Sequence, residues 1–95
     1  MKGYVVCVYK NISNEEKLNE YAIKARAAVE KYKGKFLIRG GRSTSNEGEK
    51  SPRTVLIEFS SMEDALNCYN SREYQDAMKI GKGEFDRHIQ TVEGI

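Results

Sequence analysis

Two charged side chains lie inside otherwise apolar, strand-like segments, and they are the first candidates for chemistry. Arg39 ends the run KFLIR, and Glu58 interrupts the run TVLIEFS. A charge within a buried strand is costly unless it has a partner. One interpretation is a structural ion pair between Arg39 and Glu58, which requires a cross-strand register of the right parity. The other is that the Arg39 guanidinium orients a carboxylate or enolate-like substrate while Glu58 acts as base or counter-charge.

Further candidates adjoin Arg39 or lie at a break in the second half of the chain. Gly40 and Gly41 are compatible with a bulge or with the close approach of another backbone or a ligand. Tyr69 and Tyr74 flank the break YNS, where phenol hydroxyls either line a pocket or are the capped tips of core rings. We therefore predict a ligand site formed by Arg39, Gly40, Gly41, Glu58, Tyr69, Ser71 and Tyr74, with Arg39 and Glu58 as the candidate catalytic residues.

The sequence offers little for metal, haem or nucleophilic chemistry. The single histidine, His88, lies amid polar residues and is interpreted as a structural or surface side chain, with a general base or pocket ligand as the alternative. Cys7 and Cys68 are far apart and show no metal or redox spacing, so we interpret them as reduced core thiols. No cofactor and no metal is predicted.

Length and charge limit the classes of partner. The chain has 95 residues, and a formal net charge of +2 arises from interspersed basic and acidic residues. This length predicts one domain over residues 1–95. The absence of a basic stripe argues against nucleic acid as a partner. No apolar run approaches the length of a bilayer span and no signal peptide is evident, so we predict a cytoplasmic protein without a membrane partner.

The pattern of residues predicts four strands and two helices, the second one broken. Ser13 and Glu16 have the spacing of a capping box for the first helix, and Gly34 is expected to end it in a left-handed conformation. Ser60 or Ser61 is expected to cap the second helix, and Ser71 to cap the segment after its break. The predicted strands are residues 3–9, 35–42, 54–60 and 85–94, and the helices lie within residues 13–34 and 61–80.

The order βαββαβ predicts a ferredoxin-like α+β sandwich with an antiparallel four-stranded sheet. Its helices cover only one face of the sheet. The strands at 3–9 and 54–60 are nevertheless apolar on both faces, which favours a symmetric dimer with the sheets face to face. Two familiar uses of this topology are disfavoured. Thr54 and Leu56 occupy the positions at which RNA-recognition modules stack bases, and the loop KNISNEE lacks the glycines of a phosphate cradle.

Four segments carry a resemblance to a known family: EYAIKARAAVEKYKGKFLIRGG, EGEKSPRTVLIEF, SSMEDALNCYNSREYQ and TVEG. Together they resemble the domain-of-unknown-function 1330 (DUF1330) family of the dimeric α/β barrel superfamily. The resemblance implies a ferredoxin-like protomer, a dimer whose sheets form a barrel, and a cavity between sheet and helices. It implies no reaction. Lys33 replaces the first glycine of the family's Tyr-Gly-Gly, and the arginine that the family often has in the second half of its last helix is absent from the corresponding stretch AMKIGKGEFD.

These observations favour a small cytoplasmic homodimer, or a higher oligomer of it, with a cleft for a small organic molecule, and Arg39 favours an anionic one. The superfamily includes cofactor-free monooxygenases, lactone isomerases and haem-dependent enzymes. If the chain is an enzyme, cofactor-independent isomerisation or oxygenation fits better than hydrolysis, because no activated nucleophile is visible. The alternative is a non-catalytic ligand-binding or assembly module.

Overall fold

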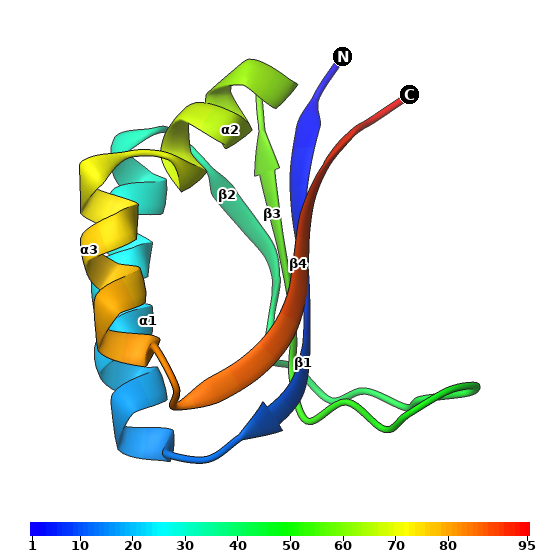
Figure 1. Cartoon of the computed structure of the whole chain (residues 1–95). Coiled ribbons are helices and arrows are strands. Elements are labelled where there is room, and N and C mark those ends of the chain that lie inside the picture. The colour runs from blue at the N-terminus through cyan, green and yellow to red at the C-terminus, as the bar shows by residue number, and fades with distance from the viewer.

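A helical layer packs against one face of a twisted sheet in the computed structural model, which describes residues 1–95 (Figure 1). The second helix of the sequence prediction is divided at the expected break, so that three helices form the layer. The elements are β1 (Gly3–Ile12), α1 (Glu15–Lys31), β2 (Lys35–Arg39), β3 (Thr54–Phe59), α2 (Met62–Tyr69), α3 (Arg72–Gly81) and β4 (Phe85–Glu93).

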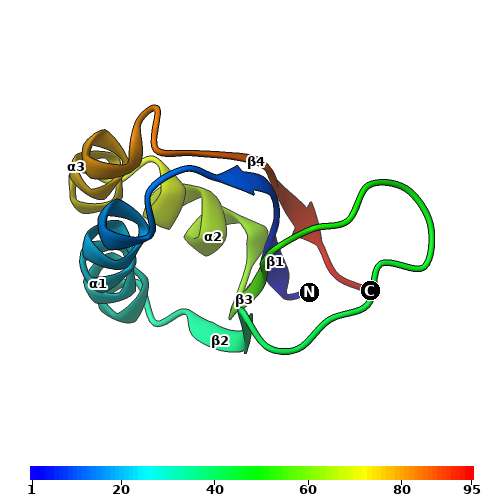
Figure 2. The same cartoon turned by 90° about the horizontal axis from the view of Figure 1, so that it is seen from below.

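The sheet has the strand order β2-β3-β1-β4, and each neighbouring pair is antiparallel. All three helices lie on the same face, as both views show (Figures 1 and 2). This arrangement confirms the predicted ferredoxin-like α+β sandwich. β1 is longer than predicted because it continues beyond Tyr9 through a register irregularity to Ile12. No helix combines the length and apolarity needed to cross a bilayer.

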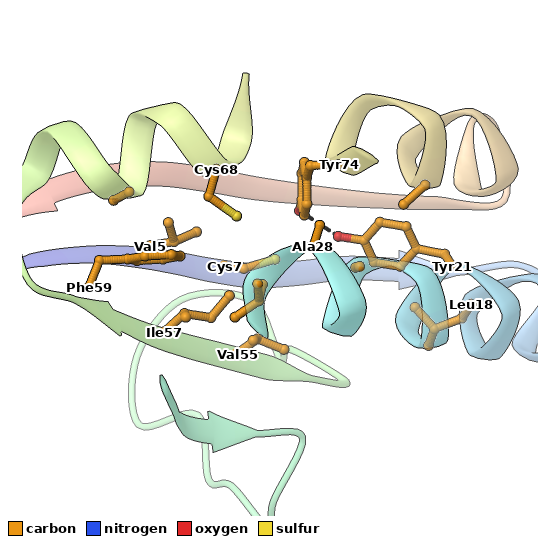
Figure 3. Packing of buried hydrophobic residues seen from close by; sticks show 14 of the residues in the cluster. Val5, Cys7, Leu18, Tyr21, Ala28, Val55, Ile57, Phe59, Cys68 and Tyr74 are labelled. Atoms are coloured by element: carbon orange, nitrogen blue, oxygen red, sulfur yellow. Dashed lines mark hydrogen bonds between the residues drawn. The ribbon is translucent and has the colours of Figure 1, made fainter. Parts of the chain in front are cut away.

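Side-chain alternation in β1 and β3 separates the two faces of the sheet. Val5, Cys7 and Tyr9 are buried under the helices, whereas Val6 and Val8 point to the opposite face. The same alternation buries the inner residues of β3. The resulting core lies between sheet and helices (Figure 3) and contains fifteen buried residues: Val5, Cys7, Tyr9, Leu18, Tyr21, Ala25, Ala28, Val29, Val55, Ile57, Phe59, Ala65, Cys68, Tyr74 and Ala77.

Residues 40–53 connect β2 to β3 and leave the sheet on the side away from the helices (Figures 1 and 2). The predicted second strand extended to Arg42, but β2 ends at Arg39. Gly40 has a φ of +72°, a left-handed conformation that β-strands do not continue. The two glycines therefore begin the connection and do not belong to the strand.

Capping side chains define the helix starts, with one difference from prediction. Ser61 and Ser71 cap α2 and α3, as expected, by accepting hydrogen bonds from Asp64 N and Tyr74 N. For α1 the cap is Asn14, whose Oδ1 accepts from Lys17 N at 3.1 Å, so the expected Ser13 capping box is wrong. The hydroxyl of Ser13 accepts instead from the amide group of the Asn11 side chain. Serine and asparagine serve equally well as caps, so adjacent candidates are not separated by residue type.

The end of α1 also differs from the expected glycine stop. Lys33 holds the left-handed conformation there, with a φ of +60°, and Gly34 does not. Gly34 is required for a different reason: a Cβ there would lie 2.7 Å from both the Phe59 ring and Val29 Cγ1. A lysine in the left-handed region carries a conformational cost that glycine avoids.

Exchanging side chains at this turn tests these two roles. Lys33→Gly is expected to raise the free energy of unfolding by about 1 kcal/mol, because it removes the left-handed penalty. Gly34→Ala is expected to lower it, because its methyl group overlaps two core side chains. Urea denaturation monitored by circular dichroism measures both. A stabilising Gly34→Ala, or a destabilising Lys33→Gly, would show that the assignment is reversed.

Candidate functional site

The guanidinium group of Arg87 lies in the interior between sheet and helices. Arg87 is on β4, and its side chain lies on the same face of the strand as those of Phe85 and Ile89, toward the helical layer. Its Nη1 donates to the hydroxyl groups of Tyr9 and Tyr21 at 3.0 and 2.9 Å, and its Nη2 donates to that of Tyr74 at 3.3 Å. We call these four residues the Arg87–tyrosine cluster.

Three elements supply the tyrosines of this cluster. Tyr9 on β1 is the cross-strand partner of Arg87, so the sheet register places the two side chains together. Tyr21 comes from the buried side of α1, and Tyr74 comes from the first turn of α3, just after the cap. The hydroxyls of Tyr21 and Tyr74 are hydrogen bonded to each other at 2.5 Å (Figure 3). Each helix is thereby connected to β4 through the same guanidinium.

The remaining neighbours of Arg87 are also uncharged. Its Nη1 contacts Cys7 Sγ at 3.6 Å, and its Nη2 contacts Met78 Sδ at 3.0 Å. Its Cζ lies 4.9 to 5.5 Å from the ring centres of Tyr21, Phe85 and Tyr9, within the range of cation–π attraction. None of the ion pairs of the structure includes Arg87. The guanidinium is thus well hydrogen bonded but has no counter-charge.

Burial determines the protonation states in the cluster. It raises the pKa of the Tyr9, Tyr21 and Tyr74 hydroxyls, and the nearby Arg87 offsets this only in part. Burial alone would lower the pKa of the Arg87 guanidinium, but its interactions with the hydroxyls and the Cys7 thiol outweigh that effect and raise it. At neutral pH the cluster therefore consists of three neutral phenols around one cation.

A small cavity of about 40 Å³ adjoins the cluster. That volume accommodates about three water-sized groups. Its lining is apolar except for three arginines, Arg39, Arg53 and Arg87, and a few hydroxyl and thiol groups, and it includes no carboxylate and no imidazole. A larger groove of about 470 Å³ runs between α3 and β4 and shares Arg87 and Ile89 with the cavity. Arg87 is therefore accessible from a space large enough for a small molecule.

The structure does not bring Arg39 and Glu58 together. Lys35 and Phe36 pair with Glu58 and Ile57, but the register then shifts at Leu37, so that Arg39 pairs with Val55. Without that shift Arg39 would share the face of Glu58. With it, Arg39 lies at the cavity and stacks on Phe36 at 4.9 Å, while Glu58 faces away from the helices. There Glu58 accepts hydrogen bonds from Lys2 Nζ at 3.0 Å and Tyr4 Oη at 3.2 Å, and these interactions lower its pKa.

Of the other predicted site residues, one belongs to the Arg87–tyrosine cluster and the rest have structural contacts or none. Tyr74 belongs to the cluster, and Tyr69 packs on its ring with 5.3 Å between centroids. Ser71 is buried and uses its hydroxyl for structure, accepting from Tyr74 N and donating to Cys68 O at 2.7 Å. Gly40 lies against the Arg53 side chain, and nothing surrounds the position that a Gly41 side chain would occupy.

The histidine and the cysteines have the expected surroundings. His88 is exposed on the sheet face away from the helices. Cys7 and Cys68 are both free and buried, and burial raises the pKa of the Cys68 thiol to about 11. No group of three or more histidine, cysteine, aspartate or glutamate residues is arranged to hold a metal ion.

Arg53, Arg87, Tyr9 and Tyr21 were not among the predicted site residues. For Arg87 a signal was present, because strand alternation places it on the same side as Phe85 and Ile89, which is the apolar side of β4. An arginine on such a face must either reach solvent or find polar partners inside. The tyrosines gave no comparable signal, because a buried tyrosine in a helix stripe is an ordinary core residue.

A family model described as Domain of unknown function (DUF1330) matches residues 2–95. No curated protein matches the sequence significantly. Solved structures share the fold. A protein of unknown function from Rhodopseudomonas palustris aligns with a TM-score of 0.81 at 13% identity, over 99% of this chain and 82% of that one.

Two further solved structures span nearly the whole chain. A dimeric protein of unknown function and ferredoxin-like fold from Bacteroides fragilis aligns with a TM-score of 0.63 at 20% identity, over 98% of this chain and 96% of that one. A protein named as a candidate antibiotic biosynthesis monooxygenase from Caulobacter crescentus aligns with a TM-score of 0.58 at 15% identity, over 99% of this chain and 89% of that one. At these identities the likeness establishes the fold alone.

The buried phenols predict a specific loss of stability at alkaline pH. In the unfolded chain a tyrosine ionises near pH 10, whereas the folded state keeps the cluster hydroxyls protonated. The unfolded state then binds fewer protons, so the free energy of unfolding falls as pH rises above 10, by about 1.4 kcal/mol per pH unit for each such group. Tyr21→Phe removes one of these groups, so it is expected to make the decline shallower by about 1.4 kcal/mol per pH unit.

Urea denaturation at a series of pH values between neutrality and pH 11 measures that decline. The hydroxyl of Tyr32 lies outside the cluster, so Tyr32→Phe is the control for the loss of a phenol. A decline that Tyr21→Phe leaves as steep as in the original protein would contradict the assignment of a raised Tyr21 pKa.

Proposed function

The chain belongs to the DUF1330 family of unknown function, and we propose that it binds a small anionic organic molecule between its helical layer and its sheet. The observation that carries this proposal is the interior guanidinium of Arg87, which has hydrogen-bond partners but no counter-charge. An unpaired buried charge is destabilising, and an anionic ligand would supply the missing partner. Hydrogen bonds between a guanidinium and a carboxylate are stronger than those to neutral phenols.

The surroundings of Arg87 favour an organic ligand over an inorganic anion. Most of the cavity lining is apolar, including Val5, Val55 and Ile89. Such a lining contributes to affinity by burying hydrocarbon surface. The groove between α3 and β4 provides an entry, and its Lys79 and Lys82 outnumber its one acidic residue, Asp86. The positive potential of this groove attracts anions toward Arg87.

Catalysis is the second candidate function. The hydroxyls of Tyr21 and Tyr74 are neutral and hydrogen bonded to each other, so one O–H group remains free to donate beside the cation, an arrangement suited to stabilising an oxyanion or enolate. The cavity lining contains no carboxylate or imidazole to remove a proton. A substrate would therefore have to be acidic enough to arrive as an anion. Cofactor-independent isomerisation, or oxygenation as in the candidate monooxygenase from Caulobacter crescentus, is compatible with such a substrate.

We also propose that residues 1–95 form one domain of a cytoplasmic homodimer whose sheets face each other in a barrel-like arrangement. The sheet face opposite the helices carries a partly exposed apolar patch: Val8 is 37%, Ile38 43% and Val92 40% exposed, and Leu56 lies among them. Two structural relatives are described as dimeric, which supports this proposal. Residues 40–53 project on the same side and would lie against the partner (Figures 1 and 2).

Matched acid and amide probes test anion binding. Isothermal titration calorimetry is expected to show hexanoate binding and hexanamide binding at least tenfold more weakly, because only the acid supplies a counter-charge to Arg87. Arg87→Gln should abolish the preference for hexanoate. The control is Arg26→Gln, on the exposed surface of α1, which should leave it unchanged. Equal binding of both probes by the original protein would refute the proposal. A preference for hexanoate that persists in an Arg87→Gln variant with an unchanged circular dichroism spectrum would also refute it.

Sedimentation equilibrium tests the dimer. The protein is expected to be dimeric at micromolar concentration, and Leu56→Asp should make it monomeric, because a carboxylate would be buried in the middle of the interface. Ile23→Asp is the control, since Ile23 is 73% exposed on α1, away from the open sheet face. A monomeric original protein, or a Leu56→Asp variant that remains dimeric, would contradict the proposed interface.

A further inference from the structure

Arg53 and Arg87 flank the same tyrosine on the inner face of the sheet. Tyr9 N donates to Arg53 O at 2.9 Å on one side, and Tyr9 pairs with Arg87 in the β1–β4 register on the other. The two guanidinium carbons lie 6.0 and 5.5 Å from the centre of the Tyr9 ring. The backbones of Arg53 and Arg87 are therefore two strand spacings, or about 10 Å, apart.

The side chains of Arg53 and Arg87 both lack a counter-charge. The ion pairs of the structure include neither Arg53 nor Arg87. The Nε of Arg53 is buried and has no hydrogen-bond partner at all. Buried polar atoms of native proteins are nearly always hydrogen bonded, so an orphaned donor on a cavity wall indicates a missing acceptor. The cavity lined by Arg53 and Arg87 contains no acidic residue that could provide it.

The chain positions Arg53 by specific contacts. The hydroxyl of Ser51 donates to Tyr9 O at 2.7 Å, which fixes the end of the 40–53 connection against β1. Gly40 leaves room for the Arg53 guanidinium, because a side chain there would collide with Nη1. Arg39, which the register shift at Leu37 turns to the inner face, also lines this end of the cavity. Two arginines therefore occupy the end opposite Arg87.

We propose that the ligand is a dianion, with one acidic group bound by the Arg87–tyrosine cluster and the second by Arg53 and Arg39. This inference rests on the proposed anion-binding function and specifies its ligand. Arg53 and Arg87 lie on either side of Tyr9, so each can address its own acidic group. The cavity also has an apolar lining, which includes Val5 and Val55 and faces the hydrocarbon part of the ligand. A dicarboxylate with a short apolar chain has this chemistry. Such a molecule is larger than the 40 Å³ of the cavity, so part of it would extend out of the cavity beside Arg39, which is exposed.

A series of chain lengths tests the inference. Calorimetric titrations compare the dicarboxylates from succinate to suberate with the monocarboxylates of equal length, from butyrate to octanoate. At least one dicarboxylate is expected to bind about tenfold or more tightly than its monocarboxylate, because it forms a second set of charge-assisted hydrogen bonds. Arg53→Gln should remove most of that advantage and change monocarboxylate affinity far less, whereas Arg87→Gln should weaken both classes.

The control for this series is Arg42→Gln, an exposed arginine of the same connection that does not line the cavity. If monocarboxylates bind as tightly as dicarboxylates at every length, the dianion inference fails and the proposed function stands. If neither class binds, the proposed function fails, and the inference fails with it. A dicarboxylate advantage that Arg53→Gln leaves intact, or that Arg42→Gln removes equally, would also overturn the assignment of Arg53.

Discussion

The interior of this protein is organised around a positive charge that the chain does not neutralise. Transferring the Arg87 guanidinium from water costs hydration, and only three phenols, two sulfur atoms and aromatic rings compensate for that loss. Those acceptors are neutral, so they satisfy the N–H groups without cancelling the charge. Because they come from β1, α1 and α3, the same guanidinium also connects both long helices to the edge strand β4.

Alternation in the sheet places three arginines and Glu58 on opposite faces. Arg39, Arg53 and Arg87 face the helices, whereas Glu58 faces away and is paired with Lys2. The separation depends on the register shift at Leu37, because a regular β2 would turn Arg39 to the side of Glu58. One extra residue in a short strand therefore adds a cation to the cavity and removes a charge from the apolar outer face.

The sequence was informative where local chemistry decides the structure and uninformative where distant segments meet. Strand alternation and the caps Ser61 and Ser71 are local patterns, and they predicted the order of elements and the break before α3. The interpretation of Arg39 and Glu58 as an ion pair depended on the strand register, and the shift at Leu37, which local sequence does not indicate, places the two side chains on opposite faces. The partners of Arg87 come from positions more than sixty residues away in Tyr9 and Tyr21, and no local pattern indicates that these side chains meet.

The outer face of the sheet is suited to contact with a second copy of the chain, and the inner face is suited to binding an anion. The outer face presents Val8, Ile38 and Val92 and suits a second copy of an equally apolar surface. The inner face offers cations and neutral phenols, which stabilise negative charge but do not remove protons. Any reaction at this site would therefore depend on an acidic substrate. The same reasoning makes tight binding of a preformed anion the property that the residues support most directly.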